Sequence, residues 1–242
     1  MSNAIVIIPT YNEIENIENI LRATFSLDKK FHVLVVDDNS PDLTALKVKE
    51  LQQEFNERLF VEVREGKSGL GTAYIHGFKW CLERGYEYIF EMDADFSHNP
   101  NDLIRLYNAC ADDGADMSIG SRYIDNNVNV VHWDMKRLLL SYFASKYVKF
   151  ITRMPIADTT AGFVCYKKNV LENIDLDKIK FVGYAFQIEM KFKAYLKKFK
   201  IIEVPVIFTD RTKGKSKMSG GIISEAIFGV ISMKLKSLFT KN

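Results

Sequence analysis

Short, β-branched apolar runs alternate with longer stretches of mixed polarity through the first half of the chain. The runs have the length and composition of buried strands and lie at residues 4–9, 32–37, 59–64, 88–93 and 116–121. Helical patterns separate them, and in residues 13–25 apolar side chains recur at the spacing of one helix face, at Ile14, Ile17, Leu21 and Phe25. This alternation predicts β-α-β units and therefore an open, mostly parallel α/β sheet of the Rossmann-like kind, flanked by helices.

Two long stretches in the second half are rich in aliphatic and aromatic residues and edged by lysines. They cover residues 136–151 and 220–239, and each has the length of an amphipathic helix. The pattern leaves two interpretations open: a helix that lies in a membrane interface, or a helix that packs on the core. No stretch reaches the roughly 18 apolar residues of a membrane span, so any membrane contact is expected to be peripheral.

Composition narrows the class of protein. The 242 residues, 47% of them hydrophobic, suffice for one domain with a substantial core. Thirty-three Lys and Arg against 31 Asp and Glu leave a net charge of +2, too balanced for a protein that coats nucleic acid. The cysteines Cys81, Cys110 and Cys165 lack metal-ligand spacing, which indicates reduced thiols and a cytoplasmic compartment. The N-terminus lacks the basic region of a signal peptide.

Polar clusters follow each of the first four predicted strands. They read "PTYNE", "DDNSPD", "REGKSGLG" and "DADFSH" in chain order. In the second cluster, Ser40 is the expected N-cap of the next helix and Pro41 its first residue. Because the carboxyl ends of parallel strands meet at one rim, where α/β proteins bind ligands, the four clusters together predict a functional site there.

The fourth cluster places Asp93 and Asp95 at the end of a buried strand. Two carboxylates this close repel each other unless a cation joins them, and leaving one bare in the interior costs several kcal/mol. Hard oxygen ligands favour Mg²⁺ or Mn²⁺, and Mg²⁺ commonly sits between one or two carboxylates and substrate phosphates. A capping turn before a helix at Pro100 is the alternative, and the spacing alone leaves it open.

An ordered set of motifs runs through most of the chain and resembles one family. The segments are "PTYNE" (9–13), "VVDDNSPD" (35–42), "GKSGLGTAYIHGF" (66–78), "MDADFSHNP" (92–100), "GSRY" (120–123), "GYAFQIEM" (183–190) and "PVIFTDRTKGKSKM" (205–218). In this order they closely resemble the dolichol-phosphate or polyprenol-phosphate mannosyltransferases, GT-A-fold members of the family 2 glycosyltransferases. The resemblance covers roughly residues 4–219. It implies a GT-A catalytic domain over 1–219 and leaves 220–242 as an amphipathic, membrane-interfacial tail.

The resemblance also implies roles for single residues. The guanosine pocket and its nucleoside contacts would be formed by Pro9, Tyr11, Glu13, Val36 and Asp38. Asp93 and Asp95 would hold Mg²⁺ or Mn²⁺ on the diphosphate, with Ala94 close to the nucleotide sugar. Basic residues facing phosphates would be Arg122, Arg211 and Lys217, and arginine suits this task because its planar fork binds phosphate oxygens bidentately.

Further residues are assigned less directly. Gln187 and Glu189 lie two residues apart and diverge on a helix, so we expect only Gln187 near the sugar or the acceptor. Asp158 is expected to orient the acceptor or one of the arginines. The chain departs from the family pattern at Val164, where an arginine is usual, at Leu43, where a glycine is frequent, and at Ser97, where some members have a glutamine near the metal.

The implied reaction is the inverting transfer of mannose from GDP-mannose to a polyprenyl (dolichyl-type) phosphate, giving a β-linked product. A phosphate monoester is already an anionic nucleophile at neutral pH, so no strong general base is required. Positive charge matters more, and Arg122, Arg137 and Arg211 are candidates to supply it. The lipid acceptor favours peripheral contact with the cytoplasmic face of a membrane, through the two amphipathic stretches or through a membrane-anchoring protein partner.

Two alternatives remain at the level of sequence. One keeps the fold and uses a UDP-sugar to transfer glucose or N-acetylglucosamine to the same lipid phosphate. The other is a non-catalytic GT-A binding module, which predicts loss of the acidic pair or of the arginines. The acidic pair and the arginines are both present, which argues against a non-catalytic module.

Overall fold

The computed structural model describes residues 2–124, 127–183, 185–210 and 220–239 of the chain, without the side chains of 220–226 and 239. The first half contains β1 (Ala4–Thr10), α1 (Ile17–Phe25), β2 (His32–Asp37), α2 (Thr44–Leu51), β3 (Leu59–Val63), α3 (Leu70–Glu83), β4 (Tyr88–Glu91), α4 (Asp102–Ala111) and β5 (Met117–Ser121). The second half contains β6 (Tyr123–Ile124), β7 (Asn127–Val128), β8 (Val130–Val131), α5 (Met135–Thr152), β9 (Val164–Lys167), α6 (Lys168–Asn173), a 3₁₀ turn (Leu176–Lys178), α7 (Ala185–Leu196), β10 (Ile201–Pro205), β11 (Phe208–Thr209) and α8 (Gly220–Phe239).

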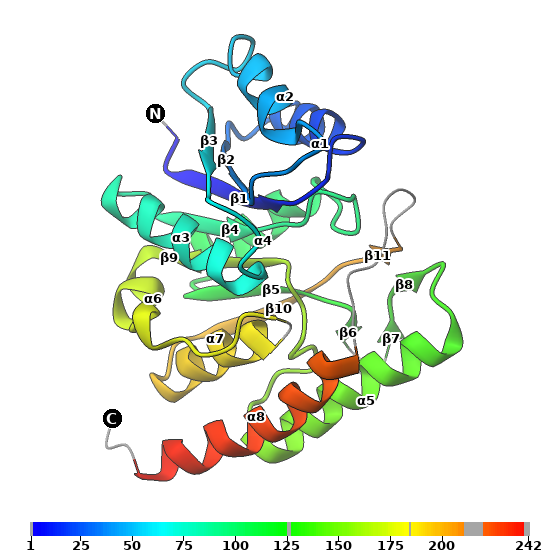
Figure 1. The fold of residues 1–242 in the computed structure, drawn as a ribbon. Helices are drawn as coiled ribbons and strands as arrows, with labels where there is room; N and C mark the ends of the chain where they lie inside the picture. The colour runs from blue at the N-terminus through cyan, green and yellow to red at the C-terminus, as the bar shows by residue number, and fades with distance from the viewer. Residues whose placement is uncertain (1, 125–126, 184, 211–219, 240–242) are drawn as a thin grey trace.

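A seven-stranded sheet with the order β10-β5-β9-β4-β1-β2-β3 forms the centre of the molecule (Figure 1). Its neighbours are parallel except for β9, which runs antiparallel between β4 and β5. The predicted open, mostly parallel α/β sheet is therefore confirmed. Two short two-stranded ribbons, β6 with β7 and β8 with β11, lie beyond the end of β5.

Alternating side chains of the central strands supply two separate cores. Ile5 and Ile7 of β1 face a cluster completed by α3, α6 and α7, whereas Val6 and Ile8 face a cluster completed by α1, α2 and α4. This is the period-2 geometry of a strand buried on both faces, and it explains why these runs are continuously apolar rather than alternating.

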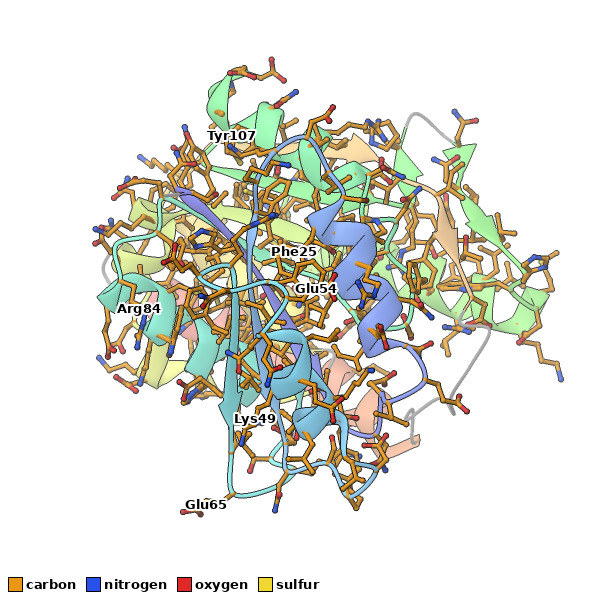
Figure 2. The ribbon with its side chains drawn as sticks, turned by 90° about the horizontal axis from the view of Figure 1, so that it is seen from above. Phe25, Lys49, Glu54, Glu65, Arg84 and Tyr107 are labelled. Carbon is orange, nitrogen blue, oxygen red and sulfur yellow. The ribbon has the colours of Figure 1, made fainter. Side chains whose placement is uncertain are left out.

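Helices α1 and α2 close one end of the sheet. The Arg22 guanidinium bridges from α1 to Glu54, just past α2, with 2.6 and 2.8 Å contacts, and the Phe25 ring stacks on Phe55 at 4.4 Å. Figure 2 labels Phe25 and Glu54 in this region. The predicted helix start at Ser40 is wrong: α2 begins at Thr44, because the Ser40 hydroxyl donates to Asp37 and accepts from the backbone N–H of Asn12. Ser40 therefore shapes the rim instead of capping a helix.

Helices α5 and α8 lie side by side at the opposite end of the molecule (Figure 1). The Tyr147 hydroxyl donates to the carbonyl of Ile227, and Val230 is buried in the core cluster that contains α3 and α7. Large apolar side chains of both helices are exposed, namely Met135, Leu139, Leu140, Phe143, Phe150, Ile227, Phe228, Ile231, Leu235 and Leu238. In the described part of the chain, no helix combines the length and hydropathy required to cross a bilayer.

The three cysteines are buried and free, as predicted. Leu43, the residue at a position where a glycine is frequent, has φ 71° and ψ 17°. This left-handed conformation suits glycine, so the chain carries a strained, exposed leucine at the start of α2.

Candidate functional site

The predicted rim is formed where the order of the sheet reverses. Strand β1 pairs with β2 on one side and with β4 on the other, because the chain returns through α3 to the far side of β1. The crevice at the carboxyl ends of the strands on either side of such a switch point is where open α/β sheets bind ligands. The structure thus brings together the polar clusters after β1, β2, β3 and β4.

The acidic pair follows β4 in a tight loop. The backbone N–H of Asp93 donates to Nδ1 of His98 at 3.1 Å, and the N–H of Ser97 donates to Oδ1 of Asp95 at 3.0 Å. Burial lowers the pKa of His98 to about 4, so its ring is neutral at pH 7 and can accept this bond. Asp95 is only 6% exposed, whereas Asp93 is partly exposed. Hydrogen bonds among its own residues therefore hold this loop together.

The capping alternative does not match the geometry. Helix α4 begins at Asp102 and its N-cap residue is Asn101, so neither Asp93 nor Asp95 occupies the capping position. Within the described residues, no group of three or more His, Cys, Asp or Glu side chains is placed to hold a metal ion. Two carboxylates fit a hard divalent cation that takes its remaining oxygen ligands from a bound phosphate group and water.

The ends of β1 and β2 form the neighbouring wall of the crevice. The buried carboxylate of Asp37 accepts from the Thr10 hydroxyl at 2.7 Å and from the Ser40 hydroxyl at 2.6 Å, which ties the two strand ends together. Asp38 is 6% exposed and accepts from Nε of Arg64 at 2.6 Å. Arg64 in turn donates to the Thr72 hydroxyl at 2.9 Å, so one guanidinium joins the ends of β2 and β3 to α3.

Other residues predicted for this wall lie as follows. Tyr11 is partly exposed, with the Lys67 ammonium 4.9 Å from its ring centroid. Glu13 is partly exposed and accepts from the Asn16 side chain at 2.9 Å. Pro9 pairs with Val36 across β1 and β2, and the Val36 side chain is fully buried in the core. Pro9, Tyr11, Glu13 and Asp38 are thus brought to one rim.

Arg122, directly after β5, forms a buried ion pair with Asp158. Arg122 donates from Nε and Nη2 to the two oxygens of Asp158, each at 2.7 Å, and its backbone N–H adds a third bond at 3.0 Å. Asp158 is fully buried and Arg122 is 8% exposed. Burial by itself raises the pKa of Asp158, but the charge and hydrogen bonds of Arg122 outweigh it and hold this pKa below its usual value. Of the two expected roles of Asp158, the structure shows the contact with an arginine.

Aromatic rings surround this arginine. The Arg122 guanidinium carbon lies 5.2 Å from the ring centroid of Tyr123 and 5.5 Å from those of Trp133 and Phe208. Arg137 approaches Trp133 from α5 and bonds to Asp210 at 2.6 Å. Arg211 and Lys217, the other two basic residues predicted to face phosphates, lie outside the described residues.

Gln187 and Glu189 diverge from α7, as expected. Gln187 is buried and its amide donates to Glu91 of β4 at 2.7 Å, beneath the acidic loop. Glu189 accepts from the backbone N–H groups of Lys180 and Phe181 at 2.8 and 3.2 Å, so it braces the segment before α7. Sequence reasoning assigned no role in the site to Arg64, Glu91, His98 and Lys191, although Arg64 and His98 lie within the quoted polar clusters and Glu91 and Lys191 directly adjoin the motif segments.

Comparison with known proteins identifies relatives over nearly the whole chain. Residues 5–175 match the family model for glycosyl transferase family 2. The chain is 46% identical over 226 residues to polyprenol monophosphomannose synthase of Mycolicibacterium smegmatis, covering 93% of this chain and 84% of that protein. It is 42% identical to undecaprenyl-phosphate mannosyltransferase of Micrococcus luteus, covering 93% and 91%.

Solved structures with the same fold are more distant in sequence. Glucosyl-3-phosphoglycerate synthase of Mycobacterium tuberculosis, with Mn²⁺, uridine diphosphate and glucosyl-3-phosphoglycerate, superposes with a TM-score of 0.69 at 14% identity, covering 99% of this chain and 81% of that one. A mannosyltransferase of Pyrobaculum calidifontis with GDP-mannose and Mn²⁺ gives 0.58 at 18% identity, covering 98% and 74%. These likenesses show that the sheet and its helices have the GT-A-type arrangement.

Proposed function

Because the chain belongs to the family 2 glycosyltransferases, we propose that it transfers mannose from GDP-mannose to the phosphate of a polyprenyl lipid, with inversion at the sugar. The 46% and 42% identical relatives are both named for mannose transfer to such lipids. The structural observation that carries the proposal is the hydrogen-bonded loop of Asp93 and Asp95 at the switch point of the sheet. An acidic pair in that place suits a cation-bound diphosphate.

In this proposal the donor lies across the ends of β1, β2 and β4. The guanosine is held by Pro9, Tyr11, Glu13 and Asp38, with Val36, whose side chain is buried in the core, supporting the pocket from β2, and the sugar lies next to Ala94. Asp93 and Asp95 hold Mg²⁺ or Mn²⁺, consistent with the oxygen-only donor set. The cation, when bound, supplies positive charge to the departing diphosphate, where negative charge grows during transfer.

The acceptor needs positive charge more than it needs a base. Its phosphate is largely ionised at neutral pH, because the second pKa of a phosphate monoester is near ~6. His98, neutral and hydrogen-bonded to Asp93, is not required as an acid or a base. We assign Arg122, Arg211 and Lys217 to the phosphates, with Asp158 orienting Arg122 and Gln187 supporting the sugar subsite from beneath the acidic loop.

Exposed apolar side chains of α5 and α8 suit contact with the membrane that contains the lipid acceptor. Phe143, Phe150 and Phe228 are 61%, 81% and 73% exposed, at the end of the molecule that carries both helices (Figure 1). We propose that residues 1–219 are the catalytic domain and that 220–242, with α5, rests on the cytoplasmic face of a membrane, alone or with a membrane-anchoring protein. Lysines such as Lys146 and Lys149 on α5 suit a surface of anionic lipids.

The decisive experiment measures transfer of radiolabelled mannose from GDP-mannose to a short-chain polyprenyl phosphate in detergent with Mn²⁺. We expect product with the wild type and a loss of about 10²-fold or more with Asp95→Ala. Asp113→Ala, which removes an exposed aspartate from the loop after α4, is the matched control and should retain activity. Transfer only from a UDP-sugar would refute the donor, and full activity of Asp95→Ala would refute the role of the acidic pair.

A further inference from the structure

Lys191 is a charged residue in the protein interior that the proposed reaction does not use. It lies on α7 and is fully buried. Its ammonium nitrogen is 2.5 Å from the carbonyl oxygen of Ala161 and 3.3 Å from both the carbonyl and the side-chain oxygen of Gln187. A protonated lysine has three N–H donors, and three acceptors surround this one, so the site matches the charged form.

Lys191 has a buried partner of opposite charge. Glu91 at the end of β4 is fully buried and accepts from the Gln187 amide at 2.7 Å, while the oxygen of the same amide faces Lys191. Gln187 thus connects the two charges. Burial raises the pKa of Glu91 to about 8 and lowers the pKa of Lys191 to about 8, and the charge of each group opposes the shift of the other. Either charge without the other would be left uncompensated in the interior, which typically costs several kcal/mol.

The contacts of Lys191 reach both halves of the site. Glu91 is two residues before Asp93. On the other side, Ala161 belongs to the segment 158–163, which begins with the aspartate bound to Arg122. The same segment ends at Phe163, whose ring stacks on His98 at 4.8 Å, and His98 accepts the N–H of Asp93. Lys191 therefore joins the segment carrying Asp158 to the strand that carries the acidic pair.

We propose that Lys191 is a positioning residue that, with Glu91 through Gln187, fixes residues 158–163 against the end of β4. This sets the spacing between Asp93, Asp95 and the guanidinium of Arg122. The inference rests on the proposed function only for the choice of nucleotide and acceptor. Apolar side chains of similar size can replace a buried ion pair with little loss of stability, so fold stability and site geometry can be separated by mutation.

The test compares Lys191→Met, Glu91→Leu and the double variant Glu91→Leu/Lys191→Met. Each single variant should unfold at a lower temperature, and the double variant should recover most of the loss because no charge is left unpaired. Binding of Mn²⁺ in the presence of GDP or UDP is then followed by electron paramagnetic resonance. Supporting residues of metal sites typically contribute 10–100-fold, so we expect the folded double variant to bind Mn²⁺ about tenfold more weakly.

Steady-state kinetics supply the second readout. The double variant should lose about tenfold in kcat, while KM for the lipid changes by less than about twofold, because the acceptor's apolar contacts are untouched. Lys193→Met is the matched control: this lysine is two residues further along α7 and partly exposed. Its ammonium bonds to the Lys178 carbonyl at 3.2 Å and pairs with Glu189 at 3.5 Å, and neither partner is assigned to the site. It should leave Mn²⁺ binding and kcat unchanged.

A double variant with wild-type Mn²⁺ affinity and wild-type kcat would overturn the inference, since the pair would then only fill the core. If the double variant does not fold, Glu91→Gln/Lys191→Gln removes both charges, keeps polar side chains at both positions and decides the same comparison. A wild type that binds Mn²⁺ with nucleotide yet transfers nothing to polyprenyl phosphate would contradict the proposed function. The Mn²⁺ comparison would still decide the role of Lys191.

Discussion

Asp158→Ala removes one member of the buried ion pair and should destabilise the protein strongly. The variant leaves Arg122, 8% exposed and ringed by Tyr123, Trp133 and Phe208, without the carboxylate that accepts three of its N–H groups. Removing one partner of a buried pair costs about 3–5 kcal/mol. Contacts with the rings and the remaining bond to Thr160 at 2.8 Å offset part of this, so we expect about 3 kcal/mol.

The assay is urea-induced unfolding at neutral pH, with Asp158→Ala, Arg122→Met and the double variant Arg122→Met/Asp158→Leu measured in parallel. The double variant should lie much closer to the wild type than either single variant, because it leaves no unpaired charge. Asp175→Ala breaks the solvent-exposed pair with Lys178 and should cause no resolvable change. A loss below about 1 kcal/mol for Asp158→Ala would refute the reasoning.

The same pair predicts a pH dependence. The pKa of Asp158 is lower in the folded protein than its unfolded value of about 3.9, so its contribution to stability is present above that value. The contribution is lost as the pH falls through the lower, folded pKa. The difference in stability between wild type and Asp158→Ala should therefore stay constant from pH 7 to pH 5 and narrow below about pH 4. A difference that widens on acidification would contradict this sign.

Two further predictions concern the surface. Leu43→Gly should stabilise the protein by about 0.5–1 kcal/mol in thermal unfolding. The strain of a leucine at φ 71° exceeds the extra chain entropy that a glycine loses on folding. A destabilised variant would show that the leucine makes an offsetting contact. The triple variant Phe143→Ser/Phe150→Ser/Phe228→Ser should bind anionic liposomes about tenfold or more weakly than the wild type in flotation assays. The control variant Leu46→Ser/Val63→Ser, at the other end of the sheet, should bind like the wild type. Equal binding of the wild type and both variants would contradict the membrane-facing assignment.

Local patterns predicted the sheet and the rim for identifiable reasons. Runs such as residues 4–9 and 32–37 are apolar at every position because both faces of their strands are buried, and that pattern is visible without a structure. The acidic pair was singled out because two carboxylates after an apolar run need partners, although its spacing alone left a capping turn open. The helix start at Ser40 was misplaced because the side chain competes for a partner 28 residues away, Asn12, which no local rule includes.

The sequence by itself determined the alternation of strands and helices, the acidic pair and the family motifs, because these depend on periodicity and on residues adjacent in the chain. Only the tertiary structure decided which polar groups satisfy one another. Asp158 and Arg122 are 36 residues apart, Gln187 and Glu91 are 96 apart, and Lys191 and Ala161 are 30 apart. A buried charge needs a partner, but the identity of that partner is set by strand order and helix docking, because these bring distant segments within hydrogen-bond distance.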